Sequence, residues 1–181
     1  MIPPRRSWQV KDEDICLELL RLIDITSEDC QLLRQLQDYA REATPDMVKD
    51  FYGRLFASDN TKEYLEGASM ERLHLMISDW FIELFSGRYD ENYARSRMHI
   101  GHIHVKIGLP VRYPLAMLDV VSGHGLAITT KSRQPDKAAR AFRKILSLDI
   151  AIFNQAYEDN QLSHLAELVG GERLARILLA G

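Results

Sequence analysis

Apolar side chains recur at intervals of three and four residues along nearly the whole chain, the spacing of α-helices that each bury one face. The clearest example lies near the C-terminal end, where the steps alternate between four and three residues through Ala138, Phe142, Ile145, Asp149, Ile152 and Ala156. Such spacing is typical of a seam between two helices. We find no run of alternating apolar and polar residues that predicts a β-strand. The sequence therefore predicts an all-α fold.

Capping residues and glycines divide the chain into about seven or eight expected helices, a number that fits a bundle or a globin-like fold. Thr26 is expected to cap a helix that runs to about Glu42, and Thr44 to cap a new helix that starts at Pro45. Tyr52 would then face the interior. Further helices are expected over residues 14–23, 70–85, 91–107 and 113–130, before the long seam helix and an amphipathic tail broken at Gly170.

Composition narrows the class of protein. A chain of 181 residues is expected to form one domain with a sizeable core. Its formal net charge of -3 gives no basic field for binding nucleic acid. The two cysteines show no metal-ligand spacing, and the start of the chain lacks the apolar region of a secretory signal, so we expect a cytoplasmic protein. The longest apolar run is interrupted by Asp119 and His124, so we expect no membrane span.

The segment "HIGHIHVKIGLP", residues 99–110, carries three histidines within six positions. Three histidines can hold a catalytic zinc ion only if they converge. His99 and His102 share a face, but His104 lies about 200° around the helix from His102 at 100° per residue. A three-histidine zinc site on this helix is therefore geometrically poor.

His104 lies on the apolar stripe with Ile100 and Ile107, so it is expected to face inward. Gly101 and Gly108 project near the same direction and would leave room for a large group beside the backbone. One inward imidazole in an apolar wall suits axial ligation of a haem. The same pattern also fits a histidine satisfied within the core, with the glycines serving as helix-crossing and helix-end residues. Spacing alone leaves both interpretations open.

The segment "IGHIHVKIGL", residues 100–109, resembles the I-G-x-x-H-x-x-I-G-L signature of the bacterial globin-coupled sensors and matches every fixed position. Upstream, "DFYGRLF" at residues 50–56 is similar to the family segment that carries a distal tyrosine, and "ERLHLMISDWFIELFSG" is similar to its distal helix. The matched order covers about residues 31–161. The resemblance implies a globin-like domain over residues 27–161, an N-terminal extension over 1–26 with an extra helix, and a C-terminal connector helix over 162–181.

The resemblance also implies roles for individual residues. His104 would be the proximal ligand of a haem b, and Tyr52 would donate a hydrogen bond to the gas on the distal side. Leu73 and Met76 would cover the distal face, although Met76 stands where some members have a polar residue. Tyr113 falls near a position at which the family usually has a large aromatic side chain close to the porphyrin. Because dioxygen is more polarised than carbon monoxide, a buried phenol hydroxyl would favour dioxygen. The alternative for Tyr52 is a core residue whose hydroxyl bonds a backbone carbonyl.

The family implies a sensor of dioxygen or another diatomic gas that signals through its last helices. The chain shows no phosphate-binding loop, cyclase motif or kinase signature, so we expect no enzyme activity and an output that lies in another domain or in a separate signalling protein. The family also implies a homodimer through the last two long helices, and the seam of Phe142, Ile145, Ile152 and Ala156 fits either that interface or the domain's own core. The alternatives are a haem enzyme, such as a nitric oxide dioxygenase or a peroxidase, and a haem-free helical interaction module.

Overall fold

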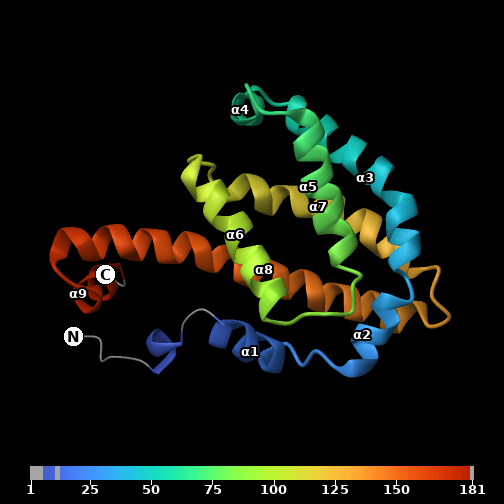
Figure 1. The fold of residues 1–181 in the computed structure, drawn as a ribbon, viewed down its shortest axis with the longest axis horizontal. Helices are drawn as coiled ribbons and strands as arrows, with labels where there is room; N and C mark the ends of the chain where they lie inside the picture. The colour runs from blue at the N-terminus through green and yellow to red at the C-terminus, as the bar shows by residue number, and fades with distance from the viewer. Residues whose placement is uncertain (1–5, 11–12, 180–181) are drawn as a thin grey trace.

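A computed structural model describes residues 6–10 and 13–179 of the chain (Figure 1). Within these residues every regular element is a helix, so the predicted all-α class is confirmed. The expected N-terminal extension and C-terminal connector each fall partly outside the described residues. The elements are, in chain order, η1 (Arg6–Gln9), α1 (Glu13–Leu22), α2 (Ser27–Arg34), α3 (Gln37–Phe56), α4 (Asp59–Lys62), η2 (Glu63–Leu65), α5 (Met70–Glu83), α6 (Glu91–Lys106), α7 (Arg112–Thr129), α8 (Pro135–Val169) and α9 (Glu172–Leu179).

The helices pack around α8, the longest of them (Figure 1). The helices α2, α6, α7 and α9 all contact α8, with α6 making the most extensive contact. A second group of contacts joins α3 to α5 and to α7. Among the described helices, α5 and α6 do not pack extensively against each other. The fold therefore has two parts, α3 with α5 and α6 with α8, which α7 connects by packing on both α3 and α8.

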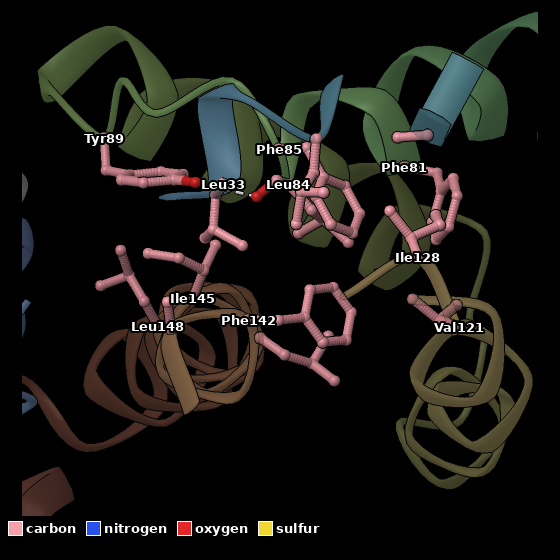
Figure 2. Close-up of a cluster of buried hydrophobic side chains, with 14 of the residues drawn as sticks. Leu33, Phe81, Leu84, Phe85, Tyr89, Val121, Ile128, Phe142, Ile145 and Leu148 are labelled. Atoms are coloured by element: carbon pink, nitrogen blue, oxygen red, sulfur yellow. Dashed lines mark hydrogen bonds between the residues drawn. The ribbon is translucent and has the colours of Figure 1, made fainter. Parts of the chain in front are cut away.

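A cluster of buried apolar side chains includes residues of α5, α7 and α8 (Figure 2). The rings of Phe85 and Phe142 are fully buried and stack at 5.2 Å between centroids. Gly125 of α7 makes room for this stack, because a Cβ atom there would lie 2.0 Å from the Phe142 ring. The aromatic stack thus requires a glycine in α7.

The seam on α8 belongs to this core. Phe142, Ile145 and Ala156 have no exposed surface, and Ile152 is 1 % exposed. Figure 2 shows Phe142 and Ile145 beside side chains of neighbouring helices, and the burial of all four seam residues leaves no surface for a second copy. Of the two alternatives left open for these residues, the structure supports the domain's own core.

Two expected helix boundaries differ from the structure. Thr26 does cap α2, in a capping box with Asp29, but the helix ends at Arg34 and α3 begins at Gln37. The expected helix start at Pro45 is wrong, because α3 continues through that residue. Instead of capping a new helix, the Thr44 hydroxyl donates to the carbonyl of Ala40 at 2.7 Å. Buried side chains on both sides of Pro45 hold the helix together despite the hydrogen bond that proline lacks.

The C-terminal end shows the expected glycine break. α8 runs without interruption to Val169, and Gly170 ends it with φ +80°, in the left-handed region that favours glycine. The chain then turns back, so that α9 packs on α8 (Figure 1). Among residues 6–10 and 13–179, no helix combines the length and the hydropathy needed to cross a bilayer.

Candidate functional site

The end of α6 fixes the position of His104. Asp90 caps the start of this helix by accepting from the backbone N–H groups of Asn92 and Tyr93. At the other end the N–H of Leu109 donates to the carbonyl of His104, and that of Gly108 to Val105, both at 2.9 Å. This pair of bonds, with Gly108 at φ +69°, is a Schellman motif. His104 therefore lies in a last turn of defined geometry.

The imidazole of His104 is half-buried and oriented by two neighbours. Its Nδ1 lies 2.7 Å from the carbonyl oxygen of Ile100, one turn earlier. Because a carbonyl only accepts, Nδ1 carries the proton and Nε2 keeps its lone pair. Burial lowers the pKa of His104, although the bond to Ile100 acts in the opposite direction, and this favours the neutral imidazole. The Phe153 ring of α8 meets the imidazole edge-on, with 5.4 Å between ring centroids. The arrangement leaves the lone pair of Nε2 to bind a metal ion, as ligation by a neutral imidazole requires.

The two neighbouring histidines do not share this environment. His99 and His102 are exposed. Across the described part of the chain, no group of three or more histidine, cysteine, aspartate or glutamate side chains is placed to hold a metal ion. His104 therefore differs from His99 and His102 in being half-buried.

Tyr52 lies on α3 and is 7 % exposed, so the prediction that it faces the interior is confirmed. Burial raises the pKa of its phenol to about 12, which keeps the hydroxyl protonated at neutral pH. Its ring contacts Phe51, at 5.5 Å between centroids, and His74 of α5, at 4.7 Å. His74 is a neighbour that the sequence did not reveal, because contact between α3 and α5 depends on the tertiary fold.

The hydroxyl of Tyr52 differs from those of other inward-facing tyrosines. Tyr89 donates to the Leu84 carbonyl at 2.8 Å, Tyr157 donates to the Leu109 carbonyl at 3.0 Å, and Tyr93 donates to Asp149. No described residue forms a hydrogen bond with the hydroxyl of Tyr52. The alternative of a core tyrosine bonded to a backbone carbonyl therefore does not describe Tyr52. Its hydroxyl is available to a ligand.

The other candidate residues differ in how far they are buried. Leu73 and Ile100 are half-buried, whereas Met76 is 40 % and Ile107 is 50 % exposed. Tyr113 is half-buried at the start of α7, where Arg112 stacks on its ring at 4.6 Å. Large apolar side chains are thus accessible on α3, α5 and α7 and at the C-terminal end of α6. They include Phe56, Leu75, Met76, Ile107 and Leu115.

Gly101 has a different role from the one expected. A Cβ atom at this position would lie 2.6 Å from the Cβ of Ala156 and 2.9 Å from the carbonyl oxygen of Phe153. Its open side therefore faces α8 and permits the close crossing of α6 and α8. This corrects the expectation that Gly101 makes room for a porphyrin. At Gly108 an added Cβ would meet nothing within 4 Å, and the positive φ that ends α6 accounts for the glycine.

Comparison with known proteins places this geometry in a family. The profile of the Protoglobin family matches residues 12–163, which is most of the chain. The chain belongs to the protoglobin family. The matched range includes the segment over which the sequence resembles the globin-coupled sensors.

Two relatives are close enough to compare directly. The globin domain of a globin-coupled sensor from Geobacter sulfurreducens superimposes on this protoglobin with a TM-score of 0.73 at 29% identity, covering 78% of this chain and 96% of that one. The haem-based aerotactic transducer HemAT of Halobacterium salinarum is 27% identical over 133 residues, which is 67% of this chain and 26% of the transducer. This protoglobin thus spans about a quarter of that relative's length.

The residues present fit a haem. His104 offers a neutral imidazole whose Nδ1 is hydrogen-bonded to Ile100, which leaves Nε2 to bind iron. Tyr52 offers a phenol whose hydroxyl has no partner among the described residues. The two come from helices that belong to different parts of the fold, because α3 packs on α5 and α7, whereas α6 packs on α8. A flat, largely apolar macrocycle needs one nitrogen ligand and apolar walls, and these helices supply both.

Proposed function

We propose that this protoglobin domain binds haem b through Nε2 of His104 and senses a diatomic gas, with dioxygen as the first candidate. The observation that carries the proposal is the bond from Nδ1 of His104 to Ile100, because it fixes the tautomer that ligates iron. When bound, the haem iron supplies a site for a diatomic gas. Ile100 and Ile107 would contact the haem from the proximal side, and Gly108 would set the end of that helix.

Tyr52 is assigned to the distal side of the site. Its phenol would donate a hydrogen bond to the gas, in surroundings of low polarity where such a bond is strong. Leu73 and Met76 would exclude water from the same face, and Tyr113 would close the site at the start of α7. No residue in the described part of the chain bonds the Tyr52 hydroxyl, and this supports the assignment.

A sensor is favoured over an enzyme because both compared relatives are described as a transducer or a sensor. The domain would pass its state through α7 and α8 to an output, located in a longer chain or in a separate signalling protein. We retain a cytoplasmic location and a homodimer through the outer faces of α7 and α8, since the inner seam is part of the core. The division into an extension of residues 1–26, a globin domain of 27–161 and a connector of 162–181 belongs to the same proposal.

Absorption spectroscopy tests the proposal. We expect the purified protein to show a Soret band, which shifts on reduction with dithionite and shifts again, reversibly, on admission of oxygen. If the folded protein neither contains haem nor binds added hemin, the proposed function is wrong and the haem-free interaction module becomes the better description. Irreversible oxidation at the first exposure to oxygen, with turnover in the presence of nitric oxide or peroxide, would instead favour the haem enzyme.

A further inference from the structure

A buried carboxylate on α8 accepts hydrogen bonds from two other helices. Asp149 is 4 % exposed. Its Oδ2 accepts from Nε1 of Trp80 on α5 at 2.7 Å, and its Oδ1 accepts from Nε of Arg97 on α6 at 2.6 Å. The hydroxyl of Tyr93, also on α6, donates to the same Oδ1. One side chain of α8 is therefore bonded to both α5 and α6.

The ion pair between Arg97 and Asp149 is buried, and one polar atom of this cluster has no hydrogen bond to any residue that the structure describes. Arg97 is 2 % exposed, pairs with Asp149, and reaches Glu83 at the end of α5 through Nη1 at 2.6 Å. Its Nη2 is buried and has no hydrogen-bond partner within the described residues. A buried ion pair with an unsatisfied donor is a poor way to stabilise a core, because apolar side chains of similar volume often do as well or better. Buried polar groups of this kind can instead select one arrangement of helices.

The position of the cluster relates it to the proposed haem site. Trp80 follows Met76 by about one turn on α5, and Arg97 precedes His104 by about two turns on α6. On α8, Asp149 precedes by about one turn the Phe153 whose ring meets the imidazole. Although α5 and α6 do not pack extensively against each other, the bonds to Asp149 and the ion pair from Arg97 to Glu83 link side chains of the two helices.

We propose that Asp149 is a positioning residue of the haem site, which holds the distal helix α5 and the proximal helix α6 in one arrangement on α8. The inference rests on the proposed function, since the site it positions is the one assigned to His104. Its consequence is that a change in the attachment of α5 reaches His104 on α6 and the adjacent part of α8. Asp149 acts through Trp80 and Arg97 and does not itself touch the gas.

The test compares two substitutions in the chain of 181 residues. Trp80→Phe keeps an aromatic ring and removes the indole N–H that bonds Asp149. Tyr89→Phe is the matched control, because it also removes one buried hydrogen bond, the one to Leu84, without releasing a helix from α8. Thermal unfolding is measured first, to show that both variants fold.

Two measurements then report on α6. Resonance Raman spectroscopy of the ferrous, ligand-free protein gives the iron–histidine stretching band, which we expect to shift in Trp80→Phe and to stay at the wild-type position in Tyr89→Phe. Hydrogen exchange, which needs no haem, should be about fivefold faster along α6 and around Asp149 in Trp80→Phe, the factor that corresponds to one lost buried hydrogen bond. In Tyr89→Phe faster exchange should be confined to the turn between α5 and α6.

A Trp80→Phe protein that folds, keeps the wild-type iron–histidine band and shows faster exchange only within α5 would overturn the inference. Asp149→Asn is a less useful first variant, because it leaves Arg97 buried without its main counter-ion and risks unfolding. The two proposals fail differently. A wild-type protein that binds no haem contradicts the proposed function, whereas a normal wild-type band that Trp80→Phe leaves unchanged contradicts only the role of Asp149.

Discussion

Replacing Tyr52 with phenylalanine separates the contribution of one hydroxyl from everything else that the side chain does. The ring remains, so the contacts with Phe51 and His74 are preserved. The hydroxyl has no hydrogen-bond partner in the described part of the protein, so its removal leaves no protein group unpaired. We therefore expect the free energy of unfolding to change by less than about 0.5 kcal/mol.

The expected effect on the gas is much larger. A hydrogen bond to a group that carries substantial charge is worth about 1.5–3 kcal/mol, and each 1.4 kcal/mol corresponds to about a factor of ten. If Tyr52 donates such a bond to dioxygen, Tyr52→Phe should speed dioxygen dissociation by roughly 10-fold to 150-fold. Carbon monoxide is less polarised and should be released at nearly the wild-type rate.

Stopped-flow displacement of each gas from the ferrous protein measures these rates. Tyr89→Phe serves as the control, because its hydroxyl does have a partner, the carbonyl of Leu84, and its loss should lower stability by about 1 kcal/mol without affecting either gas. Equal acceleration for both gases would show that Tyr52→Phe merely opens the site. Unchanged dioxygen release in a folded variant would refute the assignment of Tyr52.

Three further predictions concern the fold and the imidazole. Gly101→Ala should lower the free energy of unfolding by about 1–3 kcal/mol, because the new Cβ has no room beside Ala156; a neutral result in urea titration would contradict the close helix crossing. Ile145→Ala should lower the free energy of unfolding by about 2–5 kcal/mol at every protein concentration, because this residue belongs to the core. A loss of stability that depends on protein concentration would instead indicate that Ile145 lies in an interface between two copies. Burial holds the folded-state pKa of His104 below the ordinary 6.5, so the contribution of this histidine to stability is present above pH 6.5 and is lost as the pH falls through the folded-state pKa. Urea titrations of the haem-free protein between about pH 7 and pH 5 should show this loss of stability. In His104→Gln the loss of stability over the same pH range should be smaller.

Much of this fold could be predicted because periodicity and capping signals are local. The ends of α6 follow from Asp90 and Gly108, whose side-chain chemistry and backbone freedom act within one turn. Pro45 misled the prediction for the opposite reason. Buried residues on both sides of it hold α3 together, and burial is a tertiary property that the sequence pattern does not display.

The candidate site could be predicted in part. The inward direction of Tyr52 followed from helical spacing, but its contact with His74 depends on how α3 meets α5. Gly101 looked like clearance for a cofactor, and only the path of α8 shows what its open side faces. Asp149 carried a usable signal, since a carboxylate within an apolar seam requires buried partners. Those partners lie on other helices and cannot be identified from spacing.

The most direct test of the account is whether the His104 imidazole is the axial ligand. Absorption and resonance Raman spectra of the ferrous protein should be compared between wild type, His104→Gly and the exposed control His102→Ala. We expect His104→Gly to lose the iron–histidine band and to regain a normal spectrum when imidazole is added, while His102→Ala keeps the wild-type spectrum. A folded His104→Gly protein that retains the wild-type iron–histidine band without added imidazole would contradict the account.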